Sequence, residues 1–240
     1  MKKMVFAHRG CSGTHPENTM AAIHAAIEAD VDGIEIDVQK AKDGTLVVMH
    51  DEAVDRTTNG KGLIKDLTWD ELNSLDAGGW FSPKFKGEKV PAFDEVLEAL
   101  KGTSIILNVE MKNDLIDYPD LEQDVYESLK RFGLEKQVVI SSFNHRSLSR
   151  FSKMFPEVEL AILSESPLQN PKESMASIGA AAIHCPLEAY REMLMKEEGK
   201  GLHYRIYTMN SPTELGEWGI QDQYDVFTDY PLEALKIVRE

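Results

Sequence analysis

The residues that could do chemistry in this chain are two histidines and a set of carboxylates, each beside a predicted strand. His8 ends an apolar run that begins at Met4, and His50 ends a second run at Met49. Histidine titrates near neutral pH, so one of the pair can accept a proton while the other donates one. The pair is a candidate general acid and base, and a hydrogen-bonded structural histidine is the alternative for each.

Three carboxylates, Glu35, Asp37 and Glu110, are candidate ligands for a hard divalent cation. Glu35 and Asp37 alternate with apolar residues along one predicted strand, so both point to the same face. Carboxylate oxygen suits Mg²⁺ or Ca²⁺, which often keep coordination positions open for water or a substrate phosphate. Two alternatives stay open: a solvent-facing strand side for Glu35 and Asp37, and an ion pair of Glu110 with Lys112.

Two basic residues, Arg9 and Lys112, are candidates to hold phosphate oxygens and the charge that builds in a transition state. Solvated surface charges are the alternative. Gly10, which follows Arg9, is expected to let the backbone turn out of the fold beside a substrate, with no side chain in the way.

These residues need a fold that brings strand ends together. Leaving out a hairpin return after Asp43-Gly44, eight strands are predicted, near residues 4, 34, 105, 138, 159, 181, 204 and 225, with helices between most of them. Eight strand–helix units in 240 residues are typical of a closed (β/α)₈ TIM barrel, whose strands converge on one face at their carboxyl ends. The sequence therefore predicts an α/β fold of this type, with a doubly wound open sheet as the alternative.

One stretch, residues 52–91, interrupts this alternation. It has loop-like sequences and one capping-box pattern for a short helix. We interpret it as an insertion over one mouth of a single domain that spans residues 1–240, because long excursions in compact domains are often functional. Its aromatic residues, Trp80, Phe81 and Phe85, are expected to pack it down rather than to line a substrate mouth.

The other histidines carry less weight. His184 lies on a predicted strand and is interpreted as either a core residue or part of a pocket wall. The remaining four are expected in loops or on the surface: His15, His24, His145 and His203.

The composition excludes some classes of function. The chain is 42% apolar, and no low-complexity tract indicates disorder. It has 41 acidic and 26 basic residues and a formal charge of -15, which argues against a general nucleic-acid binder. A small phosphate ester stays open as a substrate, because a few basic groups or a metal in a cleft can set the local field.

The start of the chain has only four apolar residues before His8, whereas a secretory signal needs roughly 7–15. No run approaches the roughly 18 apolar residues of a membrane-spanning helix. Cys11 and Cys185 form no metal-ligand or redox spacing. A cytoplasmic protein without a stable membrane anchor is expected.

Together these motifs resemble the glycerophosphodiester phosphodiesterase family, and the resemblance covers the chain from end to end. The motifs that carry it are His8-Arg9-Gly10, Pro16-Glu17-Asn18-Thr19, Glu35-x-Asp37, His50-Asp51, Arg56-Thr57-Thr58-Asn59-Gly60, Glu110-x-Lys112, Ser142-Phe143 and Thr228-Asp229-Tyr230-Pro231. Any one of them is weak alone, but their order and spacing together are specific.

The resemblance implies a TIM barrel with a small insertion after the second strand. It also implies hydrolysis of glycerophosphodiesters to sn-glycerol 3-phosphate and an alcohol, helped by a divalent cation, Mg²⁺ or Ca²⁺. The implied partner is a small-molecule glycerophosphodiester, without nucleic acid or membrane anchor, and a homodimer stays open. By position, the implied roles are metal ligands for Glu35, Asp37 and Glu110, acid and base for His8 and His50, phosphate contacts for Arg9 and Lys112, a place near the metal for Glu17, a bracing role for Asn18, and an apolar substrate wall for Phe143.

The chain departs from the family at Tyr207, where a tryptophan often precedes the Thr-x-Asn motif. An aromatic wall is kept but its size differs, which affects the fit of the glycerol or alcohol group. Two other functions are weighed: a phospholipase of the same barrel type acting on lysophospholipid or phosphatidylinositol, and a catalytically dead binding barrel. The sequence leaves open which histidine is the acid, and whether water or a substrate hydroxyl attacks.

Overall fold

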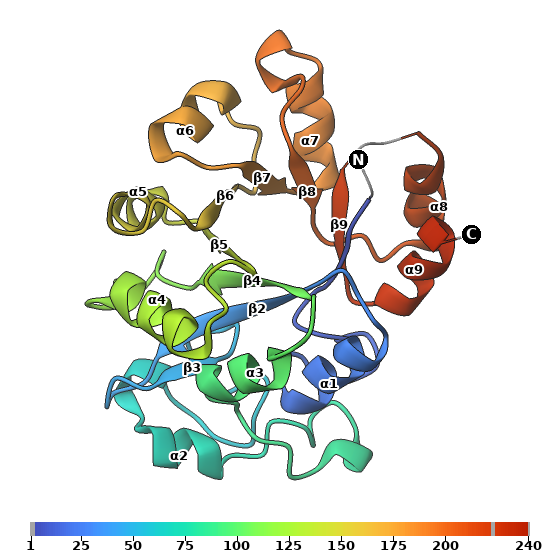
Figure 1. The fold of residues 1–240 in the computed structure, drawn as a ribbon. Coiled ribbons are helices and arrows are strands. Elements are labelled where there is room, and N and C mark those ends of the chain that lie inside the picture. Colours follow the sequence, from blue (N-terminus) through green and yellow to red (C-terminus); the bar gives the residue numbers. More distant parts are fainter. Residues whose placement is uncertain (1–2, 222–223, 240) are drawn as a thin grey trace.

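The computed structural model describes residues 3–221 and 224–239, and its centre is a closed barrel of eight parallel strands (Figure 1). The barrel strands are β1 (Val5–Ala7), β2 (Gly33–Lys40), β4 (Ile106–Met111), β5 (Val138–Ser142), β6 (Glu159–Leu163), β7 (Ala182–Cys185), β8 (Tyr204–Ile206) and β9 (Asp225–Thr228). Strand β1 closes the barrel, because Phe6 is in register with Gly33 of β2 on one side and with Phe227 of β9 on the other. The predicted TIM barrel is confirmed, and the open sheet is wrong.

Helices surround the barrel, as Figure 1 shows. They are α1 (Met20–Glu28), α3 (Phe93–Leu100), α4 (Leu121–Phe132), α5 (His145–Met154), α6 (Pro171–Ile178), α7 (Leu187–Leu194), α8 (Pro212–Gln221) and α9 (Pro231–Arg239). Local sequence sets their ends. Gly133 follows α4 with a φ of 72°, the left-handed stop that glycine adopts most easily. Asn144 precedes α5, and its side chain accepts a hydrogen bond from the Ser147 N–H at 3.1 Å.

Two helices are shorter than their sequence patterns predict. The apolar spacing over Glu17–Ala29 predicts a helix from Glu17, but α1 begins at Met20, because Asn18 has a left-handed backbone (φ 56°) and the Thr19 hydroxyl caps the helix. The charged amphipathic pattern over Glu188–Glu198 predicts a helix to Glu198, but α7 ends at Leu194, and a separate 3₁₀ turn, η3 (Glu197–Gly199), follows. Gly199 lies so close to the end of α7 that a Cβ there would be 2.1 Å from the Met193 carbonyl oxygen.

Segment 52–91 follows strand β3 (Leu46–Val48), which pairs antiparallel with β2 outside the barrel (Figure 1). The segment holds η1 (Ile64–Asp66), α2 (Trp69–Ser74) and η2 (Pro83–Phe85). Residues of β3 and of the segment form a second hydrophobic cluster, separate from the main core. The rings of Trp80 and Phe81, and of Phe81 and Phe85, lie 5.7 and 5.8 Å apart, but none of the three belongs to this cluster and Trp80 is 42% exposed, so their packing role stays a prediction.

The main core lies between the strands and the helices, where residues such as Ile34, Phe93 and Leu97 are fully buried. Separate from this core, Val139, Ala161 and Ala182 form a small buried cluster, and the buried rings of Phe6 and Phe227 lie 5.0 Å apart. Because these side chains plug the barrel, the chemistry is confined to its carboxyl end. Among the described residues, no helix combines the length and the apolar character needed to cross a membrane.

Candidate active site

The carboxyl ends of the strands surround a cavity of about 620 Å³. Most of the predicted site residues line it: His8, Arg9, Glu35, His50, Glu110, Lys112, Phe143 and Tyr207. The other three, Glu17, Asn18 and Asp37, are not among the described residues that line the cavity, but each contacts Arg9, which does.

The three predicted metal ligands form one cluster. Strand β2 carries Glu35 and Asp37, and the register of β2 with β4 places Asp37 opposite Glu110. Each of the three residues offers an oxygen within 4.8 Å of the others. Glu35 and Asp37 are 5% and 1% exposed, so the solvent-facing alternative is wrong.

The electrostatics of this cluster fit a hard divalent cation. Burial and the neighbouring carboxylates hold the pKa of Glu35 well above its ordinary value, and burial and Asp37 raise the pKa of Glu110 to about 7. Asp37 stays ionised: burial alone would raise its pKa, but the charges of Arg9, His50 and Lys112 lower it. Its Oδ1 atom is buried without a hydrogen-bond partner among the described residues. An unsatisfied oxygen in an all-carboxylate set is the ligand chemistry of Mg²⁺ or Ca²⁺.

Lys112 lies beside the cluster, and its Nζ donates to Glu110 Oε1 at 3.0 Å. The ion pair considered as an alternative from the sequence is therefore present, and it coexists with the carboxylate cluster. Burial would lower the pKa of Lys112, but the charges of Glu110 and Asp37 outweigh it and raise this pKa. Lys112 is thus a fixed positive charge on the cavity wall.

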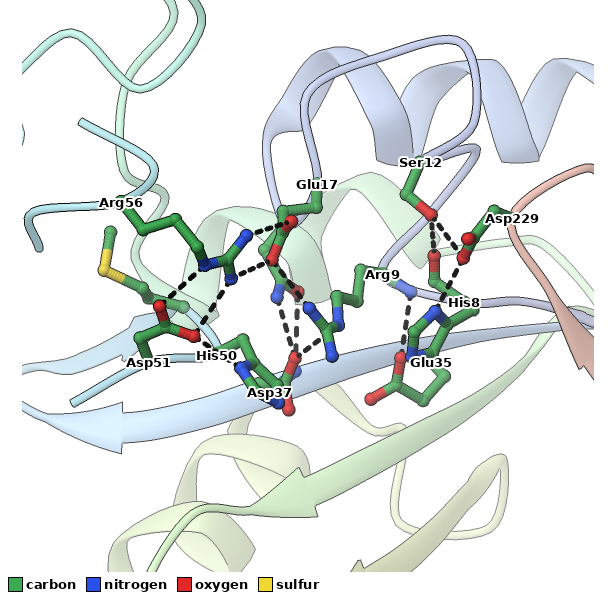
Figure 2. Close-up of polar contacts among 12 residues, drawn as sticks. His8, Arg9, Ser12, Glu17, Glu35, Asp37, His50, Asp51, Arg56 and Asp229 are labelled. Carbon is green, nitrogen blue, oxygen red and sulfur yellow. Dashed lines mark hydrogen bonds and ion pairs between the residues drawn. The ribbon is translucent and has the colours of Figure 1, made fainter. Parts of the chain in front are cut away.

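Each candidate acid–base histidine is held by its own carboxylate (Figure 2). Nδ1 of His8 lies 2.7 Å from Asp229 Oδ1, and Nδ1 of His50 lies 2.7 Å from Asp51 Oδ1. An ionised carboxylate can only accept, so Nδ1 carries the hydrogen and Nε2 remains as the nitrogen for proton exchange. Asp229 stays ionised, because hydrogen bonds, led by that of His8, lower its pKa more than burial raises it.

Arg9 turns the chain from the first strand toward the cluster. Its φ of 54° lets its backbone N–H donate to Glu35 Oε2 at 2.8 Å. Its guanidinium donates to Glu17 Oε1 at 2.7 Å and lies 3.5 Å from Asp37. Burial would lower the pKa of Arg9, but these carboxylates raise it by more than burial lowers it, so Arg9 is always charged.

Gly10 is required for a reason that differs from the expectation. Its φ is 77°, and a Cβ there would lie 2.7 Å from the backbone of Ala22 in α1. The missing side chain leaves room for the helix, so the close approach is to α1 and not to a substrate.

The first loop braces this arrangement. The Asn18 amide donates to Asp37 Oδ2 at 2.8 Å, the bracing role that the resemblance implies. Glu17 accepts from both Arg9 and Arg56. Hydrogen bonds and charge from these two residues hold the pKa of Glu17 below its ordinary value against the effect of burial.

The far side of the cavity has an aromatic wall. The rings of Phe143 and Tyr207 lie 6.5 Å apart at 82°, and the Tyr207 hydroxyl donates to the Ser164 carbonyl at 3.1 Å. His145, expected in a loop or on the surface, lines the cavity and donates through Nε2 to the Leu163 carbonyl at 2.9 Å. His184 is fully buried and also touches the cavity, so it belongs to core and wall together.

Sequence reasoning assigned no role to three residues that contact the predicted site: Asp51, Arg56 and Asp229. Each stands in a motif that carries the resemblance, which is the signal that could have drawn attention to them. The motifs do not show which of their residues are in contact, since Asp229 is 221 positions from His8 in the sequence.

A closed barrel with an acidic cluster, two carboxylate-held histidines and basic groups at one mouth defines a (β/α)₈-barrel enzyme with a phosphate-ester type of site. Comparison with known proteins makes the class specific. The model of the "Glycerophosphoryl diester phosphodiesterase family" matches residues 8–233. The chain belongs to this family.

Curated relatives and solved structures agree with the family model. The chain is 39% identical to a glycerophosphodiester phosphodiesterase of Bacillus altitudinis, with 98% of both chains covered. It is 45% identical to one of Caldanaerobacter subterraneus subsp. tengcongensis, over 77% of this chain and 76% of that one. The structure superposes on an Oleispira antarctica phosphodiesterase in complex with the product sn-glycerol-3-phosphate, with a TM-score of 0.86, 27% identity and coverage of 99% and 97%.

Proposed function

We propose that this protein hydrolyses glycerophosphodiesters to sn-glycerol 3-phosphate and an alcohol, with Mg²⁺ or Ca²⁺ bound by Glu35, Asp37 and Glu110. The observation that carries the proposal is the convergence of this carboxylate cluster and two carboxylate-held histidines on one cavity. The product complex of the Oleispira antarctica phosphodiesterase supports the choice of substrate class.

The bound cation would supply Lewis-acid stabilisation of the negative charge on the phosphate. Two basic residues on the cavity wall add to it. Arg9 presents a planar fork and Lys112 a compact charge, and both are held in place by carboxylates before substrate binds. Such preorganised charges stabilise a transition state without reorganising during the reaction.

The histidines move the protons. One accepts a proton at Nε2 from the nucleophile, which is water or the glycerol hydroxyl of the substrate. Attack by the glycerol hydroxyl releases the alcohol and forms a cyclic phosphate, which water then opens to sn-glycerol 3-phosphate. The other donates a proton to the oxygen of the leaving alcohol. Because Asp229 and Asp51 hold the two Nδ1 atoms, both rings keep Nε2 available for transfer. The aromatic wall of Phe143 and Tyr207 gives the apolar part of the substrate a surface to pack against.

The test is turnover of glycerophosphocholine with Mg²⁺ or Ca²⁺, followed through the release of sn-glycerol 3-phosphate. We expect activity in the wild type and a loss of at least about 100-fold in His8→Ala, the range typical of general acid–base catalysis. His24→Ala is the matched control, because His24 is exposed on α1 and should leave turnover unchanged. Full activity in His8→Ala, or no release of sn-glycerol 3-phosphate by the wild type, would overturn the proposal.

A further inference from the structure

Arg56 lies in segment 52–91 and bonds two carboxylates from two different loops (Figure 2). Its Nε and Nη2 donate to Asp51 Oδ2 and Oδ1 at 2.7 and 2.9 Å. Its Nη1 and Nη2 donate to Glu17 Oε2 and Oε1 at 2.8 Å each. One guanidinium thus makes two bidentate contacts, the geometry that a planar fork permits and an ammonium does not.

Each of these carboxylates also accepts a hydrogen bond from a residue that lines the cavity. Asp51 accepts from Nδ1 of His50, so it connects Arg56 to a proposed proton-transfer group. Glu17 accepts from Arg9, so it connects Arg56 to a proposed phosphate contact. Arg56 itself is not among the described residues that line the cavity. Its contacts therefore reach the cavity through His50 and Arg9.

The backbone around Arg56 is fixed by local contacts. Ala53 and Leu63 form an antiparallel bridge that closes the loop, and the Val54 N–H donates to the Gly62 carbonyl at 2.9 Å. The Thr58 hydroxyl donates to the Val54 carbonyl at 2.7 Å. Val54 is fully buried in the hydrophobic cluster of the segment. This anchoring lets Arg56 transmit the position of segment 52–91 to the cavity.

The charges of the network agree with this role. The hydrogen bonds of Arg56 lower the pKa of Asp51, and hydrogen bonds from Arg56 and Arg9 lower the pKa of Glu17 against the effect of burial. Both carboxylates are therefore ionised and accept from Arg56 with full charge. An ordinary surface ion pair, such as Arg131 with Asp94, joins two exposed side chains, and neither of them is among the described residues that line the cavity.

We infer that Arg56 is a positioning residue of the reaction, which makes segment 52–91 a working part of the active site: it holds His50 through Asp51 and Arg9 through Glu17. The inference rests on the proposed function for its kinetic consequence. Its structural consequence, that the ring of His50 loses its fixed orientation and tautomer without Arg56, stands without any assumption about the substrate.

The experiment compares the wild type with Arg56→Ala, Arg56→Lys and the control Arg131→Ala. Histidine-ring ¹H–¹⁵N NMR spectra should show His50 as the Nδ1–H tautomer in the wild type and in Arg131→Ala, and a mixture of tautomers in Arg56→Ala. With glycerophosphocholine, kcat/KM should fall by about 100-fold in Arg56→Ala, because small displacements of catalytic groups have effects of this size. Arg56→Lys should remain impaired, since an ammonium cannot bridge both carboxylates.

Two further readouts separate positioning from folding. Guanidinium ion, at a concentration too low to unfold the protein, should restore part of the turnover of Arg56→Ala, and sodium at equal ionic strength should not. Asp51→Asn should mainly lower kcat, Glu17→Gln should mainly raise KM, and Arg56→Ala should do both. Unchanged His50 signals in Arg56→Ala would overturn the inference. Wild-type values of kcat and KM in Arg56→Ala would also overturn the inference, while the proposed function would stand because the wild type is active. If the wild type is inactive but the His50 signals change in Arg56→Ala, the proposed function is wrong and the positioning of His50 by Arg56 stands.

Discussion

Replacing Asp229 by asparagine is the sharpest test of how His8 is held. Both oxygens of the Asp229 carboxylate receive donors in the structure. Oδ1 accepts from His8 Nδ1 at 2.7 Å and from the Ser12 hydroxyl at 2.9 Å, while Oδ2 accepts from the Asn210 amide at 2.6 Å. An asparagine side chain has one oxygen, so one of these two sides must face an N–H₂ group instead.

The residues around Asp229 determine which of its two hydrogen-bonded sides is disrupted in the asparagine variant. Asn210 cannot turn its amide around without loss, because its oxygen already accepts from the Asp229 backbone N–H at 2.9 Å and from Thr228. If the new amide nitrogen faces Asn210, two donors meet and His8 keeps only a neutral acceptor. If it faces His8, the ring must move its proton to Nε2, which is the wrong tautomer for proton exchange.

The expected magnitude follows from these two cases. Losing a hydrogen bond to a charged acceptor costs about 2 kcal/mol, or about 30-fold in kcat. The tautomer error costs more: the corresponding Asp→Asn change in serine proteases lowers kcat by about 10⁴-fold. We therefore expect Asp229→Asn to lower kcat by at least about 30-fold, with a smaller effect on KM.

The assay is steady-state hydrolysis of glycerophosphocholine at saturating cation, at a temperature where thermal melts show both proteins folded. Asp70→Asn, an exposed position in α2, is the control and should match the wild type. A folded Asp229→Asn variant with kcat within about three-fold of the wild type would show that Asp229 does not hold His8 for catalysis, because so small a loss lies far outside the range expected for a lost charged partner.

Three other predictions follow from the same structure. Glu110 has a pKa of about 7 in the folded protein, above its ordinary 4.5, so the chelated protein should lose stability as pH rises through this window. Thermal melts in EDTA at pH 5 and pH 8 should show a fall in Tm that is smaller in Glu110→Gln than in the wild type. An equal fall in both proteins would contradict this role of Glu110. Gly10→Ala should cost at least about 2 kcal/mol in urea unfolding, because a Cβ would meet the Ala22 backbone, whereas Gly102→Ala, with a similar φ of 76° and open space, should cost only about 1 kcal/mol; equal costs would refute the clash. Phe143→Ala should raise KM for glycerophosphocholine about 10-fold and leave kcat within about three-fold, since the ring supplies packing and no proton; a fall in kcat alone would count against the wall.

Much of the barrel could be predicted from the sequence, because each strand is a short buried run set off by a turn or a helix signal. The buried runs Val138–Ser142, Glu159–Leu163 and Asp225–Thr228 each predict a strand, and β5, β6 and β9 have these bounds. Gly133 and Pro231 mark the end of α4 and the start of α9 as glycine and proline usually do. The strand-end rule of barrels predicts a site at the carboxyl ends of the strands, and eight of the predicted residues line the cavity there.

What sequence patterns could not supply are the contacts between distant side chains. Nothing local pairs His8 with Asp229 or lets Arg56 reach Glu17 from 39 positions away, since such contacts depend on barrel closure and on how segment 52–91 folds back. The sequence predicts a loop or surface position for His145, and only the closed barrel brings this residue to the cavity. The role of Gly10 was likewise decided by the packing of α1.

The most direct test of the central claim is cation dependence of turnover at the carboxylate cluster. The wild type is stripped with chelator, and hydrolysis of glycerophosphocholine is measured as Mg²⁺ or Ca²⁺ is added back, beside Asp37→Asn prepared in the same way. We expect the stripped wild type to be inactive and its turnover to return with a saturable dependence on the cation, whereas Asp37→Asn should need far more cation or not recover. Turnover that survives chelation, or a cation response in Asp37→Asn equal to that of the wild type, would contradict the central claim.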